Sequence, residues 1–376
     1  MSGLGILLFI VALLLMIMLH EAGHFFTAKW FGIKVEEFFV GFGPRLWSFR
    51  RGETEYGIKA IPAGGYVRIA GMNPFQEPAP EDIPRTFGAK PAWQRAIVLV
   101  AGSVTHFLLA ILLLASALMF VGEPIFGRPV VGAVDPTLDG RPSPAVAAGL
   151  MVGDEIVEVN GEPIDSSEEL IRLTGESLGE EMTLVVLRDG RRETVRAAPV
   201  LSTVEGEKVA RLGIRITSEI VGRDRVNPAS ALWRGVKLTG DLTVASVKGL
   251  GQIFSPSGLG RLWNLLTGQA QRQVDDPAGI VGAGRLAGQA ASSGNLDLLL
   301  GFLAALNVFV GILNILPLPP LDGGHLAVLG LEKLTGKTID VRKLIPITAV
   351  VAGLLILLTL SLTYLDLVEP IPNPFR

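Results

Sequence analysis

The chain has 376 residues, of which 49% are hydrophobic and only 18% are charged, and its formal net charge is −3. Together with a mean hydropathy of +0.47, this balance favours an integral membrane protein, because soluble domains carry about 25% charged residues. The net charge excludes a broad attraction for nucleic acid, and the absence of cysteine excludes disulfides and thiolate metal sites.

The first predicted helix is an apolar run over residues 4–19 that continues into His20, Glu21 and His24. Two histidines four residues apart lie on one face of a helix, so both can reach one zinc ion, and the glutamate between them can take a proton from water. Ionisable side chains inside a membrane-length helix indicate a functional site. The alternative, two histidines at a helix end near the membrane interface, leaves Glu21 without a role. The run lacks the basic start and cleavage site of a signal peptide, so we expect it to be retained.

Four stretches reach the roughly 20 apolar residues that a spanning helix needs. They are residues 3–28, 96–121, 298–318 and 345–365. Lysine and arginine gather after the first stretch and between the third and fourth, so we expect these two loops to face the cytoplasm. Both termini and residues 122–297 would then lie outside.

Between the first two spans, residues 33–70 are rich in glycine, aromatic and β-branched residues and predict short strands separated by turns. One interpretation is a small cytoplasmic hairpin. The other is an exposed edge strand beside the metal that holds an unwound substrate peptide by strand addition, because a helix keeps every carbonyl in its own hydrogen-bond ladder. Residues 74–84 contain four prolines and predict a flexible link.

The segment after the second span predicts a β-rich domain. Its short strands, a polar helix near residues 166–174 and the pattern AGLxxGDxIxxVNG resemble bacterial PDZ domains over roughly residues 127–217. Such domains bind extended peptides beside a strand; the alternative is an inert spacer. Residues 226–294 show helical periodicity that suits membrane-surface or bundle packing, and no chemistry is assigned to them.

A catalytic zinc usually has three protein ligands, and His20 and His24 supply two. Asp322 is the best candidate for the third. It follows the third span in a proline-rich segment that breaks the helix, so the freed backbone must lie inside protein or beside a watery cavity. Gly323 and Gly324 permit turns there. The alternative is that the aspartate only caps a helix at the interface.

Together these motifs resemble the bacterial site-2 proteases, which are RseP-like zinc intramembrane (RIP) metalloproteases of the peptidase M50 type. The resemblance covers nearly the whole chain. It rests on HExxH in the first span, on GFGPRLWSFRRGETEYGIKAIPAGGYVRIAGM at residues 41–72, on KPAWQR before the second span, on one PDZ-like domain and on NxxPxPPLDGG.

The resemblance implies a Zn²⁺ cofactor and roles for five residues. The zinc ligands would be His20, His24 and Asp322. Glu21 would be the general base, and Asn314 is associated with substrate handling.

Some features depart from the family pattern, among them the second span and the number of PDZ-like units. Where the second span of the family often reads AGPxxNF, this chain has His106, which we expect to be packed and hydrogen-bonded rather than a metal ligand. Only one PDZ-like unit is visible, so gating by a tandem pair does not transfer. His325, directly after the LDGG motif, is expected to cap the turn.

The predicted fold is an α-helical polytopic membrane protein with four transmembrane helices, a membrane-reentrant β element and an extracytoplasmic α+β PDZ domain. The expected divisions are residues 1–28 (first span with HExxH), 29–95 (cytoplasmic or reentrant β loop and linker), 96–121 (second span), 122–217 (PDZ-like domain), 218–297 (helical membrane-surface region), 298–320 (third span leading to LDG), 321–344 (cytoplasmic loop), 345–365 (fourth span) and 366–376 (extracytoplasmic tail).

The predicted function is zinc-dependent cleavage of the transmembrane segment of single-span membrane proteins, for which the family's typical substrates are anti-sigma factors and remnant signal peptides. The resemblance also implies that a site-1 type protease cuts first outside the membrane. We expect the bacterial plasma membrane as the location, with the active site toward the cytoplasm, and single-span substrates and the lipid bilayer as partners. The alternative is a membrane-anchored PDZ binding module with a non-catalytic zinc site, for which Glu21 is dispensable.

Overall fold

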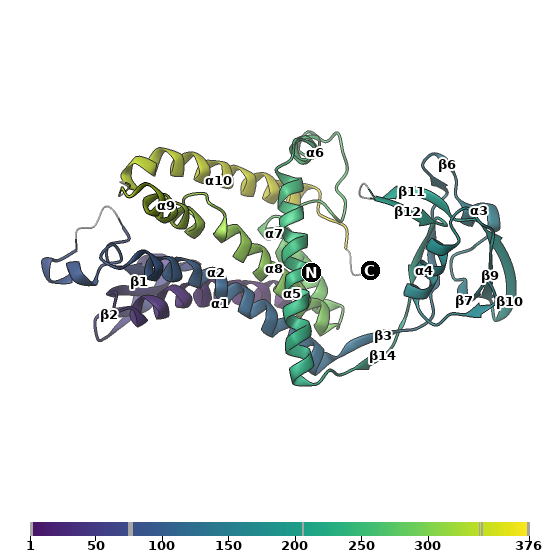
Figure 1. Ribbon diagram of the computed structural model, residues 1–376, viewed down its shortest axis with the longest axis horizontal. Coiled ribbons are helices and arrows are strands. Elements are labelled where there is room, and N and C mark those ends of the chain that lie inside the picture. The colour runs from purple at the N-terminus through teal and green to yellow at the C-terminus, as the bar shows by residue number, and fades with distance from the viewer. Residues whose placement is uncertain (1–2, 74–77, 205–206, 338, 340, 374–376) are drawn as a thin grey trace. The chain divides into compact units, whose positions relative to one another are not determined.

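The computed structural model of the protein describes residues 3–73, 78–204, 207–337, 339 and 341–373 (Figure 1). The chain forms two compact units, one from Met1–Val121 with Val226–Arg376 and one from Gly122–Arg225. Part of the predicted link over residues 74–84, namely residues 74–77, lies outside the described residues. The rest of that link contains a short 3₁₀ helix, η1 (Pro80–Arg85), whose Asp82 pairs with Lys34 at 2.5 Å.

The first unit is built mainly from helices. They are α1 (Gly3–Trp30), α2 (Ala92–Ser116) with its π-helical extension η2 (Ala117–Val121), α5 (Pro228–Ile253), α6 (Pro256–Leu266), α7 (Ile280–Ser292), α8 (Leu296–Ile315), α9 (Asp322–Thr335), η3 (Val341–Leu344) and α10 (Ile345–Val368).

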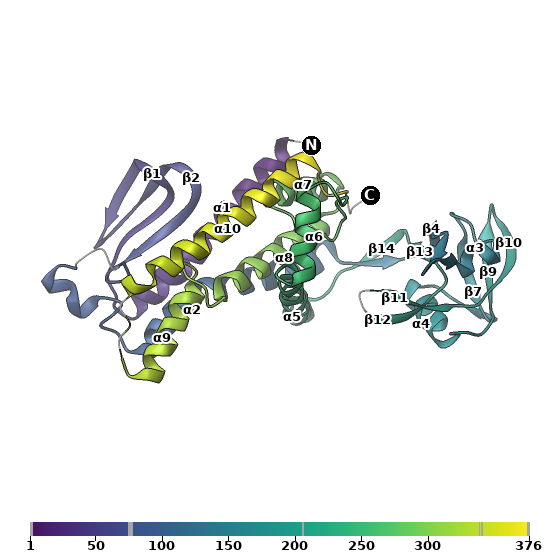
Figure 2. The ribbon, with the colours of Figure 1, turned by 90° about the horizontal axis from the view of Figure 1, so that it is seen from above.

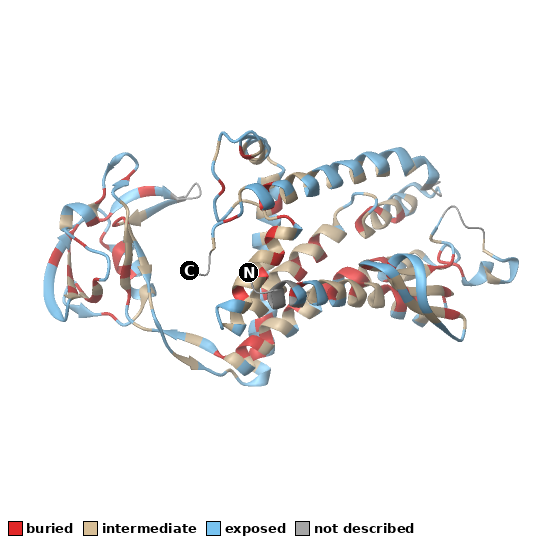
Figure 3. Cartoon of the chain, turned by 180° about the vertical axis from the view of Figure 1, so that it is seen from behind, coloured by how far each residue is buried: buried red, intermediate tan, exposed pale blue. Residues whose placement is uncertain are grey.

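Four helices in the described part of the chain are long and apolar enough to cross a membrane: Phe9–Trp30, Ala92–Val121, Leu296–Ile315 and Arg342–Val368. The prediction of four helices that are long and apolar enough to span a membrane is therefore confirmed. The third ends at Ile315, earlier than expected, because Pro317 and the prolines after it cannot continue the hydrogen-bond ladder. Helix α10 exposes most of its apolar surface (Figure 3), as a helix in contact with lipid does.

The helices pack closely where side chains are small. Helix α2 lies against α1 and α8, and a Cβ on Gly23 of α1 would come within 2.7 Å of the carbonyl oxygen of Ala101 on α2. The C-terminal end of α10 is held by Asp366, which pairs at 2.9 Å with Arg272 and accepts the N–H of Gly282 in α7 at 2.6 Å. Both charged side chains are fully buried, and the ion pair compensates the charge of each.

Strands β1 (Val35–Arg51) and β2 (Thr54–Ile69) form an antiparallel sheet beside the α1 end that carries the histidines (Figure 2). Both strands bend, so each pairs twice. Phe38, for example, lies opposite Tyr56 on one side and opposite Val67 on the other. The spatial order is residues 65–69, 35–40, 54–58 and 45–51, which makes residues 65–69 one edge of the sheet.

The second unit is a β-rich domain, as the sequence predicts for this segment. Its main sheet runs β10 (Arg191–Ala197), β9 (Met182–Arg188), β7 (Glu155–Val159), β4 (Val130–Val134), β13 (Ile214–Thr217), with β8 (Glu162–Pro163) paired to β7. The other elements are helices α3 (Pro144–Ala148) and α4 (Ser167–Glu176) and the pairs β3 (Glu123–Phe126) with β14 (Ile220–Asp224), β5 (Thr137–Leu138) with β6 (Arg141–Pro142), and β11 (Val200–Val204) with β12 (Glu207–Arg211).

An ion pair fixes the loop before β7. Asp154 is 1% exposed and accepts two hydrogen bonds from Arg188, both at 2.7 Å, and one from the N–H of Met151 at 2.8 Å. Burial raises the pKa of Asp154, but the bonds from Arg188 and Met151 outweigh it and hold the pKa below its ordinary value.

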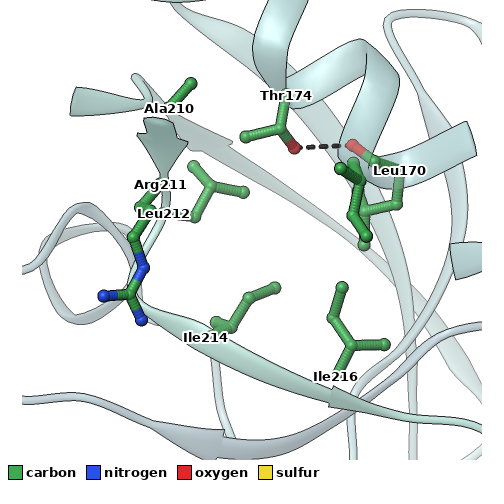
Figure 4. A pocket seen from close by; sticks show the side chains of 8 residues that line it. Leu170, Thr174, Ala210, Arg211, Leu212, Ile214 and Ile216 are labelled. Atoms are coloured by element: carbon green, nitrogen blue, oxygen red, sulfur yellow. Dashed lines mark hydrogen bonds between the residues drawn. The ribbon is translucent and has the colours of Figure 1, made fainter. Parts of the chain in front are cut away.

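An apolar pocket of about 330 Å³ opens between α4 and β13, the edge strand of the main sheet (Figure 4). Leu170 and Thr174 of α4 line one side, and Leu212, Ile214 and Ile216 line the other. The pocket is thus a short apolar groove beside β13, which is the outermost strand of the main sheet.

Candidate metal centre

The two histidines of the HExxH motif lie side by side on the inner face of α1. Helix α1 runs without interruption from Gly3 to Trp30, so His20 and His24 are one turn apart. Both residues are buried, at 8% and 6% exposure, and their Nε2 atoms are 3.1 Å apart. Both ring nitrogens thus point at one spot.

Asp322 reaches the same spot from a distant part of the chain. It is the first residue of α9, after the proline-rich turn that follows α8. A Cβ on Gly323 would lie 2.0 Å from the carbonyl oxygen of Ile315, and one on Gly324 would lie 2.5 Å from the nitrogen of Pro319. Only glycine therefore lets α9 start directly against the end of α8, which directs Asp322 inward.

The three side chains form a triangle of the size that a zinc ion requires. The Asp322 Oδ2 atom lies 3.3 Å from Nε2 of both His20 and His24. Four ligands at about 2.0–2.2 Å in a tetrahedron are separated by about 3.3 Å. One His, Asp or Glu atom from each of these residues falls within 4.8 Å of the others, and among the described residues no other such group of three occurs. The donor set and its spacing fit zinc.

The hydrogen bonds around the triangle also suit a metal. The Nδ1 atom of His24 lies 2.7 Å from the carbonyl oxygen of Val98 in α2. That ring nitrogen must be the protonated donor, which leaves Nε2 with a free lone pair. Asp322 Oδ2 is buried without a hydrogen-bond donor in the described chain. An uncompensated buried carboxylate oxygen facing two imidazoles is costly unless a cation sits between them.

Gly102 of α2 lies directly against the two imidazoles. A Cβ at this position would lie 2.4 Å from His24 Nε2 and 2.7 Å from His20 Nε2. Any larger residue would therefore occupy the place where the ring nitrogens converge. The sequence reasoning missed this residue, although the small residues Ala101-Gly102-Ser103 in the second span are a signal of close helix contact.

The Gly102→Ala variant is expected to lose zinc. Alanine usually stabilises a helix interior by about 1 kcal/mol relative to glycine, but here its methyl group displaces both imidazoles. Metal content measured by mass spectrometry should fall well below one zinc per chain. Gly301→Ala in α8 is the matched control, because a Cβ there meets nothing within 4 Å. Full zinc occupancy in Gly102→Ala would contradict the role of Gly102.

His106 packs beside the triangle but is not part of it. It is 1% exposed, its ring centroid lies 5.0 Å from that of His20, and its Nδ1 atom is 3.1 Å from Oδ1 of Asn307 in α8. The Asn307 amide nitrogen donates to the carbonyl oxygen of Leu303 at 2.8 Å, so its Oδ1 accepts from His106. His106 is thus a packed, hydrogen-bonded histidine, and it ties α2 to α8.

Glu21 lies between the two histidines in sequence and is half-buried. Its Oε2 accepts the backbone N–H of Val67, on the edge strand of the β1–β2 sheet, at 3.0 Å.

Two other residues that the sequence analysis named lie outside the triangle. Asn314, in α8, is half-buried and makes no side-chain hydrogen bond to the described residues, and His325 lies within α9 with no capping bond there.

Comparison of the sequence with known proteins identifies the family to which the chain belongs. The profile of Peptidase family M50 matches residues 8–359. The chain belongs to peptidase family M50. It is thus a zinc metalloprotease of the site-2 protease type, and its four apolar helices make it a membrane protein. The predicted family and enzyme class are confirmed.

Several similar proteins match over almost their full length. Zinc metalloprotease Rip1 from Mycobacterium tuberculosis is 34% identical, with 98% of each chain covered. Rip1 from Mycolicibacterium smegmatis is 35% identical, with 99% of each covered. Zinc metalloprotease RasP from Geobacillus kaustophilus is 28% identical, covering 96% of this chain and 97% of the relative. A solved PDZ domain of an SdrC-like protein from Listeria monocytogenes aligns with 25% of this chain and 92% of its own, at 20% identity and a TM-score of 0.21.

Proposed function

We propose that this protein hydrolyses a peptide bond inside the membrane-spanning segment of single-span membrane proteins. The observation that carries the proposal is the position of the triangle. His20 and His24 lie within a helix of membrane-spanning length, and the end of a second such helix leads to Asp322. Such costly groups inside spanning helices indicate a reaction there rather than in a soluble domain.

The chemistry follows from the residues at the triangle. Zinc held by His20, His24 and Asp322 would polarise the scissile carbonyl and make water a stronger acid. Glu21 takes the proton from the water that attacks the carbonyl carbon. The C–N bond then breaks, and Glu21 returns the proton to the leaving nitrogen. The products are a carboxylic acid and an amine, which ionise to a carboxylate and an ammonium group, and Glu21 ends in its starting state.

The substrate must be extended at the cleavage site, because a helix keeps its carbonyls hydrogen-bonded. The edge formed by residues 65–69 contacts α1 beside Glu21, and strand addition at this edge would hold an unwound segment there. Asn314, half-buried one turn before the proline-rich segment, is proposed to contact this segment. Neither role requires a particular substrate sequence.

The order of events is also part of the proposal. A first protease trims the substrate outside the membrane. The PDZ-like domain then either keeps out substrates that still carry a bulky ectodomain or receives the new end of a trimmed substrate in its apolar pocket. Anti-sigma factors and remnant signal peptides are substrates of the expected kind. The excess of lysine and arginine after α1 and between α8 and α10 supports an active site toward the cytoplasm of a bacterial plasma membrane, with the PDZ-like domain and both termini outside.

The proposal is tested with the full chain in liposomes that contain a single-span substrate with a short ectodomain. Cleavage within the span, located by mass spectrometry, is expected to stop when 1,10-phenanthroline removes zinc and to return when zinc is restored. A substrate cut only outside its span, or cleavage that is unaffected by the chelator, would refute intramembrane zinc-dependent hydrolysis.

A further inference from the structure

The carboxylate of Glu21 is held by a single backbone group. Its Oε2 atom accepts the N–H of Val67 at 3.0 Å, and no other donor in the described residues bonds to this side chain. A hydrogen bond to an ionised acceptor is roughly twice as strong as a neutral one. The orientation of this carboxylate therefore depends on where one strand of the β1–β2 sheet lies.

The strand that supplies this N–H is fixed against α1 at both ends. A Cβ on Gly65 would lie 2.5 Å from Sδ of Met18, so the strand backbone contacts α1 one turn before Glu21. At the other end, Ile69 is 3% exposed and packs in the same apolar cluster as Phe25, one turn after Glu21. The peptide that contains the Val67 N–H is thus held at a defined height along the helix.

The N–H of Val67 is not needed by the sheet. Alternate residues of an antiparallel edge strand direct their N–H and C=O groups toward the partner strand and away from it. Val67 lies opposite Phe38 on the neighbouring strand, but its N–H donates to Glu21. It is therefore an outward-facing group on the edge of the sheet that has no second partner strand among the described residues, and backbone donors on such an edge are left unpaired by the sheet.

We infer that the backbone N–H of Val67 is a positioning group for catalysis, which holds one oxygen of Glu21 so that the other is aimed at the attacking water. This inference rests on the proposed role of Glu21 as general base. Proton transfer requires a base within hydrogen-bond reach and in a fixed orientation. It follows that a substrate strand added at this edge pairs through outward-facing groups other than this N–H.

Removing the N–H while keeping the sheet tests the inference. Val67→Pro deletes the donor at a position where an edge strand tolerates proline, and Val67→Ala is the matched variant that shortens the side chain but keeps the donor. We expect kcat of Val67→Pro to be about 10- to 100-fold below that of Val67→Ala, the effect of losing a hydrogen bond to a charged group. The KM and the zinc content of the two variants should agree within about twofold.

An ester in place of the Tyr66–Val67 peptide bond removes the same N–H without proline's restraint and should lower kcat alike, relative to the all-amide chain. This variant keeps the test decisive if Val67→Pro fails to fold. Equal kcat for the ester and the all-amide chain would overturn the inference. The proposed function would remain intact in that case, because the unaltered chain would still cleave and its zinc dependence would be unchanged.

A second measurement needs neither zinc nor substrate. Hydrogen exchange at the Val67 amide in the metal-free full chain should be slow, although the amide lies at a sheet edge. Glu21→Gln keeps an acceptor oxygen and should preserve the protection, whereas Glu21→Leu should speed exchange at least tenfold. Equal exchange rates in all three chains would show that the contact does not persist and would overturn the inference.

Discussion

Replacing Glu21 with glutamine is expected to remove peptide hydrolysis while zinc stays bound. Glutamine has nearly the same shape and can still accept the Val67 N–H, but it cannot take a proton from water at neutral pH. Loss of a general base lowers the rate by about 10²- to 10⁴-fold, which corresponds to about 3–5 kcal/mol of activation free energy. Initial rates on a single-span substrate in liposomes, with zinc measured on the same preparation, give the result.

The control for this variant is Glu36→Gln in β1, which removes a carboxylate outside the histidine–aspartate triangle. Its activity should stay within about twofold of the unaltered chain. Cleavage that persists in Glu21→Gln with full zinc would instead favour the alternative function, a membrane-anchored PDZ binding module whose metal is structural.

The Asp322→Asn variant is expected to lose zinc and, with it, activity. The amide keeps the size of the carboxylate, but its neutral oxygen is a poor ligand beside two imidazoles whose Nε2 atoms are only 3.1 Å apart. Changes to groups that merely support zinc ligands cost about 10- to 100-fold in metal affinity, so loss of a ligand should cost more than about 100-fold. Competition with a fluorescent zinc chelator measures this affinity directly.

His325→Gln is the matched control, because His325 lies one turn further along α9 and is not part of the triangle. Its zinc affinity should match that of the unaltered chain. Unchanged zinc affinity in Asp322→Asn, or a loss confined to His325→Gln, would remove Asp322 from the ligand set.

Much of the fold could be predicted from local patterns. The long apolar runs predict α1, α2, α8 and α10 because only a helix satisfies its own backbone in lipid. The end of α8 is predicted less well: the apolar composition continues past Ile315, whereas the helix stops where the prolines remove the donors. The glycine, aromatic and β-branched composition also predicts the strands around residues 33–70, but not that β1 and β2 each bend and pair twice.

The candidate site divides in the same way. The spacing of His20 and His24 within one helix places them on a common face whatever the rest of the chain does. Asp322 could be suggested because a third ligand was missing, because it follows the third span in a proline-rich, glycine-flanked segment, and because the LDGG motif resembles that of the family. Gly102, Asn307 and the N–H of Val67 were not foreseen, since each acts through a contact with a residue far away in the sequence.

By itself, the amino-acid sequence determined the spanning helices, the paired imidazoles with Glu21 between them, and the resemblance to a protease family, because these depend on composition and on spacing within single elements. Tertiary structure decided what meets them. Asp322 reaches the histidines because Gly323 and Gly324 let α9 start against the end of α8. The physical reason is that the distance between side chains that lie about 300 residues apart in the sequence depends on the packing of helices, and no local pattern records it.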